Sequence, residues 1–208
     1  RGLEKVGIAD EVRKVALPMN GRIMHDINSQ LSYQPYGKDG QAIYSVSRGG
    51  LNCVLMDLAE KQGVEIFFNE KCDSVDLKKG NAVFENFETQ KKTEVHADYL
   101  FATDGAGSAA RLQLQLSTDR FQYSQQYLEH GYKELSIPPT PEGDFAMDPT
   151  ALHIWPRGSF MLIALPNMDK SFTCTLFFPF DGENSFNSLD TEEKMMTFFT
   201  KMFPDAVP

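Results

Sequence analysis

Clustered positive charge is scarce in this sequence. Its 20 lysines and arginines stand against 29 aspartates and glutamates, which gives a formal net charge of −9 at pH 7. Binding to a nucleic-acid backbone needs grouped Lys and Arg side chains, so a nucleic-acid partner is not expected. The basic residues are instead expected to act one at a time.

Paired cysteines and metal-ligand spacings are also missing. The three cysteines, Cys53, Cys72 and Cys174, are widely spaced and none belongs to a CxxC pair, which fits a reducing compartment. The four histidines show neither an HExxH pattern nor a pairing with cysteine of the zinc-ligand type. We therefore expect no metal site, and structural roles for the histidines.

Long hydrophobic runs are absent too. The apolar run at residues 160–165 is far shorter than the roughly 20 residues that span a bilayer, so no transmembrane helix is expected in this piece. The sequence opens without an initiator Met or a signal segment, and both ends are expected to be cuts in a longer protein. Its 41% hydrophobic and 24% charged residues are ordinary for a soluble globular chain and argue against disorder.

The first part of the chain predicts alternating short helices and strands. Helix-like spacing over residues 2–16, broken at Gly7, predicts two short helices that meet at a turn. Extended runs at residues 22–27, 31–35 and 43–47 predict a small antiparallel meander.

The next part predicts an α/β layer. Leu51, Leu55, Leu58 and Ala59 mark one face of an amphipathic helix that ends before Gly63. Strands are predicted at residues 64–68, 75–77, 82–87, 93–95 and 99–102, the last leading through residues 103–108 into a helix that includes Arg111. Strand, helix and strand in this order are typical of a Rossmann-like nucleotide-binding layer, so the fold class expected is α/β with α+β mixing.

The composition changes after about Leu116. Aromatic and β-branched residues then fill extended runs, including residues 152–155, 160–165 and 172–178. A final helix at residues 195–202, capped from Asp190 and stopped by Pro204, closes the pattern. We therefore expect one domain at residues 1–116 and a second, sheet-dominated domain at residues 117–208.

Two features of the sequence are candidates for ligand binding. Asp104 and Gly105 follow an apolar strand, where the glycine permits close backbone approach and the carboxylate can accept hydrogen bonds from a ribose, although the same pair is common in plain turns. Arg48 lies between a strand and a helix start, where its guanidinium could reach a phosphate or a flavin edge, or remain a solvated turn arginine.

The spacing of these features resembles a known family. Residues 46–52 followed by residues 104–106 are similar to two blocks of the FAD-dependent aromatic hydroxylases. Further segments resemble the branch of that family that hydroxylates L-kynurenine, and the likeness spans nearly the whole chain: residues 21–25, 34–37, 44–48, 121–127, 130–135, 143–147, 152–157, 163–167 and 170–177.

The resemblance implies a substrate site. Arg22 and Tyr36 would hold the α-carboxylate of the substrate, a planar donor fork beside a phenolic hydroxyl, although Arg22 could equally be a strand arginine that faces solvent. The residues that would line a pocket for the aromatic ring are Leu152, Met161, Ile163, Leu165 and Phe177. Judged by residue type alone, these five would be core residues.

The resemblance also implies a cofactor site. Arg48, Asp104 and Gly105 would contact FAD, Arg1 would be a further contact, and the backbone of Cys72 would lie near the adenine. Arg111 could support the Asp104 turn or help NADPH to dock, although residue type favours a salt bridge on the helix face.

The activity implied is hydroxylation of L-kynurenine to 3-hydroxykynurenine. In this family NADPH reduces FAD, the reduced flavin reacts with O2, and a flavin C4a-hydroperoxide passes one oxygen atom to the ring, so no catalytic dyad is required of the protein. A hydroxylase of another aromatic acid and a non-catalytic, truncated flavoprotein-like module stay open as alternatives.

The family pattern is expected to extend past both ends of this sequence. A GxGxxG loop that cradles FAD should precede Arg1, and further flavin and substrate contacts should follow Pro208, so residues 1–116 would be a partial FAD-binding domain and residues 117–208 a partial substrate domain. Membrane attachment through a C-terminal segment outside this sequence stays open. The compartment expected is the cytoplasm or, in a eukaryote, the cytosolic side of the mitochondrial outer membrane.

Overall fold

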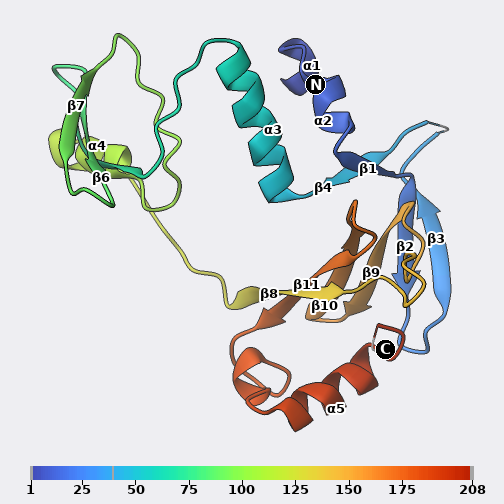
Figure 1. Cartoon of the computed structure of the whole chain (residues 1–208). Coiled ribbons are helices and arrows are strands. Elements are labelled where there is room, and N and C mark those ends of the chain that lie inside the picture. The colour runs from blue at the N-terminus through green and yellow to red at the C-terminus, as the bar shows by residue number, and fades with distance from the viewer. Residues whose placement is uncertain (1, 39, 207–208) are drawn as a thin grey trace. The chain divides into compact units, whose positions relative to one another are not determined.

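Two compact units make up the chain. The computed structural model describes residues 2–38 and 40–206 (Figure 1). Unit 1 contains Arg1–Gln62 and Leu128–Pro208, and unit 2 contains Gly63–Tyr127. The boundaries between these units differ from the single boundary expected between residues 116 and 117. They differ because strands from both ends of the sequence share one sheet in unit 1. The cofactor and substrate roles assigned to the two expected domains stay predictions.

A six-stranded sheet forms the centre of unit 1. Its neighbours pair antiparallel, except that β2 and β9 run parallel. In spatial order the strands are β3 (Leu31–Pro35), β2 (Gly21–His25), β9 (Ala151–Arg157), β10 (Phe160–Pro166), β11 (Phe172–Pro179) and β8 (His130–Ile137). The extended runs expected at residues 152–155, 160–165 and 172–178 are confirmed as three adjacent strands.

The two faces of this sheet differ in burial. Side chains alternate across a strand, and in β9, β10 and β11 every second residue is buried. Trp155, Leu162 and Cys174 point to the covered face and are at most 2% exposed. The residues between them are half-buried or exposed, so the sheet has one covered face and one open face.

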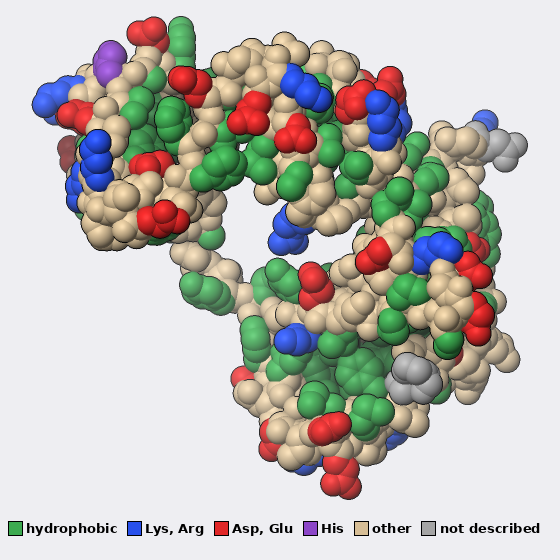
Figure 2. Space-filling view, viewed as in Figure 1, with side chains coloured by type: hydrophobic (Ala, Val, Ile, Leu, Met, Phe, Trp, Pro, Cys, Tyr) green, Lys and Arg blue, Asp and Glu red, His purple; other side chains and the backbone are tan. Residues whose placement is uncertain are grey.

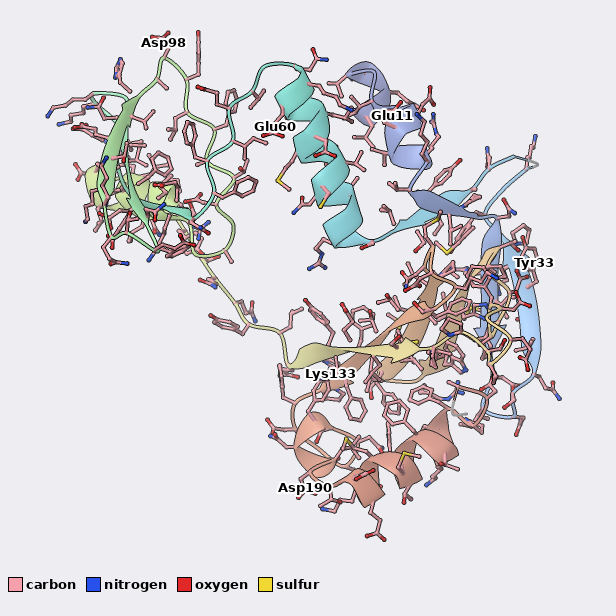
Figure 3. The ribbon with its side chains drawn as sticks, in the orientation of Figure 1. Glu11, Tyr33, Glu60, Asp98, Lys133 and Asp190 are labelled. Carbon is pink, nitrogen blue, oxygen red and sulfur yellow. The ribbon has the colours of Figure 1, made fainter. Side chains whose placement is uncertain are left out.

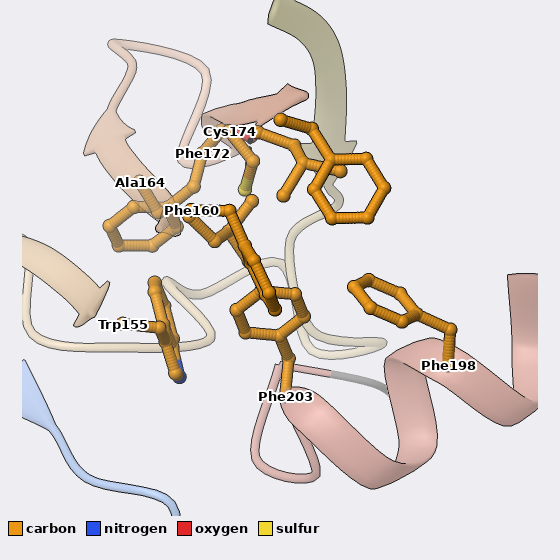
Figure 4. Packing of buried hydrophobic residues seen from close by; sticks show 10 residues of the cluster. Trp155, Phe160, Ala164, Phe172, Cys174, Phe198 and Phe203 are labelled. Atoms are coloured by element: carbon orange, nitrogen blue, oxygen red, sulfur yellow. Dashed lines mark hydrogen bonds between the residues drawn. The ribbon is translucent and has the colours of Figure 1, made fainter. Parts of the chain in front are cut away.

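The helix α5 (Glu192–Met202) packs on the covered face. Thr191 caps it by accepting a hydrogen bond from the amide of Lys194, as the capping pattern predicts. Phe198 of α5 and Phe203 just after it contact Phe160 of β10 through tilted and edge-on ring pairs (Figure 4). The short 3-10 helix η1 (Phe186–Ser188) precedes α5, and Phe186 packs against the same cluster.

A buried chain of hydrogen bonds ties the C-terminal turn to this sheet. The Asp205 carboxylate lies 2.5 Å from Nδ1 of His25, whose Nε2 lies 2.8 Å from Nδ1 of His153, and Nε2 of His153 lies 2.9 Å from the Asp148 carbonyl oxygen. Trp155 donates its indole N–H to the same carboxylate at 2.9 Å.

The Asp148 carbonyl oxygen determines which nitrogen of His153 carries the proton. It can only accept, so this hydrogen bond needs the His153 proton on Nε2, and Nδ1 of His153 is then left to accept from Nε2 of His25. Burial would raise the pKa of Asp205, but hydrogen bonds from His25 and Trp155 outweigh it and leave that pKa lowered. Burial lowers the pKa of His153, which fits its neutral form.

The N-terminal part of unit 1 is only partly as expected. Two short helices, α1 (Gly2–Lys5) and α2 (Ala9–Arg13), meet near Gly7, which has a φ of 74°. The predicted three-stranded meander is wrong at its last strand. Strands β2 and β3 form a hairpin, but β4 (Ile43–Val46) pairs with β1 (Ala16–Met19), a strand that was not predicted. The amphipathic helix is confirmed as α3 (Arg48–Lys61).

Unit 2 is a small three-stranded sheet with one helix. The strands β5 (Glu70–Asp76), β6 (Asn81–Asn86) and β7 (Lys92–His96) pair antiparallel, and α4 (Ala109–Ser117) packs on them around Val75, Ala82 and Ala110. The strands predicted at residues 82–87 and 93–95 and the helix that includes Arg111 are confirmed, whereas β5 begins five residues before the run predicted at residues 75–77.

Two predicted strands of unit 2 do not form. Residues 64–68 and 99–102 have no strand conformation, and Phe67 and Phe101 are 74% and 88% exposed. Both runs were predicted from apolar composition, but a strand also needs a neighbour to pair its backbone groups. In the described part of the chain neither run has one.

Candidate functional site

The open face of the six-stranded sheet brings the predicted substrate residues together. They come from four strands and the residue that follows a fifth: Arg22 from β2, Tyr36 just after β3, Leu152 from β9, Met161, Ile163 and Leu165 from β10, and Phe177 from β11. Figure 3 marks the two edges of this sheet by Tyr33 on β3 and Lys133 on β8. Residues spread over more than 150 positions in sequence therefore share one surface.

Strand register places these side chains on the same face. Arg22 pairs with Leu152, and Met161 pairs with Phe177, so both pairs lie side by side across the sheet. Met161 is 39% exposed and the other four apolar residues are half-buried. The expectation from residue type that these five form the core is wrong, because the alternating residues on the opposite face fill it.

The polar end of this face contains Arg22 and Tyr36. The Arg22 guanidinium donates from Nε to Oε1 of Gln34 at 2.8 Å. Burial raises the pKa of the Tyr36 phenol above its ordinary value, and the nearby Arg22 charge only partly opposes this, so the hydroxyl stays protonated as a donor at neutral pH. An arginine fork beside a phenol suits a carboxylate ligand.

Arg48 lies at a hollow next to the apolar part of the open face. Ser47 caps α3 by accepting from the amide of Gly50 at 3.3 Å, which leaves Arg48 exposed in the first turn. The hollow measures about 740 Å³, and it is lined by residues 45–49 together with Leu165, Glu134, Asn167, Thr173, Thr175 and their neighbours. One hollow thus touches Arg48, a predicted FAD contact, and Leu165, a predicted substrate contact.

Sequence reasoning missed several residues of this surface. Gln34, Glu134, Thr173 and Thr175 were not singled out, although Thr173 and Thr175 share the period of two with Phe177 and could have been placed on its face. The position of Glu134 depends on the pairing of β8 with β11, which no local pattern shows.

In unit 2 Asp104 organises the turn before α4. Its carboxylate accepts from the Ser108 hydroxyl at 2.6 Å and from the amide of Ala109 at 2.8 Å, and the Ser108 bond is the main reason that the pKa of Asp104 is lowered. Gly105 has a φ of 75°, which a side chain would strain. The pair therefore has a clear structural role, and its contact with FAD stays a prediction.

Arg111 does not form the helix-face salt bridge that residue type favoured. It donates from Nη1 to the Gly105 carbonyl at 3.1 Å and from Nη2 to the Ala106 carbonyl, and its guanidinium lies 4.8 Å from the centre of the Tyr123 ring. No acidic side chain pairs with it within the residues that the structure describes. Arg111 thus contacts the turn through both carbonyl oxygens, and a role in NADPH docking stays a prediction.

Cys72 lies close to Asp104. Both line a hollow of about 260 Å³ together with Phe84 and Ala110, and burial followed by the Asp104 charge raises the pKa of the Cys72 thiol. Apolar walls beside a carboxylate fit a base joined to a ribose, so this hollow suits part of a dinucleotide. The remaining predicted contact, Arg1, lies outside the described residues.

Across residues 2–38 and 40–206, no three His, Cys, Asp or Glu side chains are grouped as metal ligands. The described helices include none with the length and apolar character to cross a bilayer. Apolar side chains gather between β8 and α5 (Figure 2), where Leu135, Met195 and Phe199 line a hollow of about 330 Å³.

Comparison with known proteins gives the family of this chain. Residues 1–196 match the family model of the FAD binding domain. A kynurenine 3-monooxygenase from Flavobacterium psychrophilum is 48% identical over 205 residues, which are 99% of this chain and 45% of the relative. One from Dictyostelium discoideum is 49% identical over 207 residues, covering 98% of this chain and 44% of the relative. The chain thus spans less than half the length of these curated relatives.

Solved structures share the fold. A tetrameric form of 2-methyl-3-hydroxypyridine-5-carboxylic acid oxygenase superposes with a TM-score of 0.71 at 18% identity, over 98% of this chain and 51% of that one. A variant of HpxO from Klebsiella pneumoniae complexed with FAD gives 0.63 at 12% identity, over 99% of this chain and 51% of that one. The chain therefore belongs to the FAD binding domain family, with a mixed α/β fold, and is a homologue of the kynurenine 3-monooxygenases.

Proposed function

We propose that the protein containing this chain is an FAD- and NADPH-dependent monooxygenase that converts L-kynurenine and O2 to 3-hydroxykynurenine. The observation that carries the proposal is the open face of unit 1, on which a cation and a phenol stand at one end of a half-buried apolar surface. Relatives named kynurenine 3-monooxygenase, 48% and 49% identical to this chain, support this choice of substrate.

Substrate binding is the first task of the open face. In this proposal Arg22 and Tyr36 hold the α-carboxylate by donating charged and neutral hydrogen bonds. The aromatic ring lies against Leu152, Ile163 and Phe177, whose apolar side chains displace water and fix its orientation. The polar end and the apolar surface together select an aromatic amino acid.

Cofactor binding is the second task. FAD supplies, when bound, the redox chemistry that takes a hydride from NADPH and delivers an oxygen atom from O2 to the ring. Arg48, at the start of α3, offers a cation without an acidic partner in the described part of the chain, beside the amide-rich end of a helix. Asp104, Gly105 and Cys72 would hold another part of the cofactor, and Arg111 would act by keeping the Asp104 turn in shape.

The test is kynurenine binding by the FAD-loaded, full-length protein. Arg22→Ala should weaken binding by about 1.5–3 kcal/mol, the contribution of a hydrogen bond to a charged group, which corresponds to roughly 10–150-fold in Kd. Lys133→Ala is a matched control, since Lys133 is an exposed cation of the same sheet on an edge strand and lies outside the proposed site. An unchanged Kd for Arg22→Ala would contradict the assignment.

A further inference from the structure

Gln34 is the direct neighbour of Arg22 across the β2–β3 hairpin. The two residues are paired in the strand register, so both side chains leave the same face of the sheet. The amide oxygen of Gln34 accepts from Nε of Arg22 at 2.8 Å. Both residues are exposed, and this is the one hydrogen bond that the Arg22 side chain makes within the described residues.

The chemistry of this partner matters because it is neutral. A guanidinium has five N–H donors, and the bond from Nε leaves the four on Nη1 and Nη2 for a ligand. Although the chain carries 29 acidic residues, no carboxylate pairs with Arg22 in the described part of the structure. An amide holds the guanidinium in place and leaves its full charge available, whereas a carboxylate at the same position would neutralise it.

Tyr36 completes the same corner of the open face. It follows Gln34 by two residues, and its backbone amide continues the hairpin by donating to the Asn20 carbonyl at 3.1 Å. Its phenol is close enough to Arg22 for the cation to influence its ionisation. Gln34 is therefore a neighbour of both groups that, in the proposed function, receive the substrate carboxylate: it is paired with Arg22 across the hairpin and precedes Tyr36 by two residues.

We propose that Gln34 is a positioning residue that sets the preference of this site for carboxylate-bearing aromatic substrates by anchoring Arg22 through Nε without neutralising it. The inference rests on the proposed function, in which Arg22 binds the carboxylate. Gln34 contributes orientation, and Arg22 contributes the charge.

The test compares two ligands in the FAD-loaded, full-length protein: L-kynurenine and kynuramine, its analogue without the carboxylate. Gln34→Glu should raise the Kd and KM for L-kynurenine about tenfold to a hundredfold, because the introduced carboxylate competes for Arg22, while kcat at saturation stays within about threefold. The Kd for kynuramine should stay equal or fall. Gln34→Met, which removes the acceptor but adds no charge, should raise the Kd for L-kynurenine only severalfold.

Three results would overturn the inference, and they have different meanings. If Arg22→Ala weakens L-kynurenine binding but Gln34→Glu does not, the role of Gln34 is wrong and the proposed function stands. If neither variant changes the binding of L-kynurenine, both fail. An equal loss of affinity for both ligands in Gln34→Glu would indicate general damage to the hairpin and would also reject a role in carboxylate selection.

Discussion

Removal of the Asp205 carboxylate should destabilise unit 1 strongly. In Asp205→Ala the indole N–H of Trp155 and the Nδ1 of His25 both lose their acceptor, and these two residues are 0% and 4% exposed. An unsatisfied buried polar group costs about 1–3 kcal/mol. Two such contacts are lost with the carboxylate, so we expect a total loss of about 2–5 kcal/mol.

Urea unfolding of the chain measures this loss directly. Trp155 is the single tryptophan, so its fluorescence reports on the sheet to which Asp205 is bound. Asp190→Ala is the matched control: Asp190 also accepts a hydrogen bond, from Lys194 at 2.7 Å, but both side chains are more than half exposed. The control should lose far less stability than Asp205→Ala, because solvent screens an exposed ion pair.

Free energies of unfolding for Asp205→Ala and Asp190→Ala that agree within about 0.5 kcal/mol, the usual effect of a surface substitution, would refute a stabilising role of the Asp205 carboxylate. That result would mean that the buried chain from Asp205 to His153 contributes no net stability. A loss of about 2–5 kcal/mol would be a large part of the roughly 5–15 kcal/mol that holds a typical domain folded.

Three further predictions follow from burial and close contacts. Burial lowers the pKa of His153 below 6.5, so as the pH falls through about 6.5 the His153 imidazole takes up a proton in the unfolded chain before it does so in the folded one. The urea midpoint should therefore be lower at pH 5.5 than at pH 7.5. A midpoint that is flat or higher at pH 5.5 would contradict this prediction. A Cβ added at Gly21 would lie 2.6 Å from a carbonyl oxygen of the facing strand, so Gly21→Ala should cost about 1–3 kcal/mol in urea unfolding, whereas Gly2→Ala, with no atom within 4 Å, should cost nothing. Burial raises the pKa of Cys174 to about 11, so a thiol reagent at pH 8 should modify exposed Cys53 within minutes and Cys174 only after unfolding. Equal rates of modification would contradict the burial of Cys174.

Local patterns predicted every strand of the main sheet except β8, but not which face is covered. The alternation in β9, β10 and β11 follows from residue order, yet both faces carry apolar side chains, Leu162 and Cys174 on one and Ile163 and Phe177 on the other. The choice depends on where α5 packs, and that is a tertiary contact. Residue type therefore placed the five pocket residues in the core, whereas family resemblance grouped them as one surface.

Other features were not predicted correctly because they depend on contacts between residues that are distant in sequence. His25 and Asp205 are 180 positions apart, and no spacing rule connects them. The runs at residues 64–68 and 99–102 have strand-like composition, but composition does not supply a pairing neighbour. By contrast the caps of α3 and α5, at Ser47 and Thr191, are local hydrogen bonds, and both helices lie where the sequence predicts them.

The open face of unit 1 as a kynurenine site is tested most directly by substrate-stimulated NADPH oxidation in the FAD-loaded, full-length protein, with product analysis. L-kynurenine should stimulate NADPH oxidation and yield 3-hydroxykynurenine, whereas simple phenols, which offer Arg22 and Tyr36 no carboxylate, should not stimulate it. Stimulation and hydroxylation with a different aromatic acid, and none with L-kynurenine, would contradict the proposed substrate.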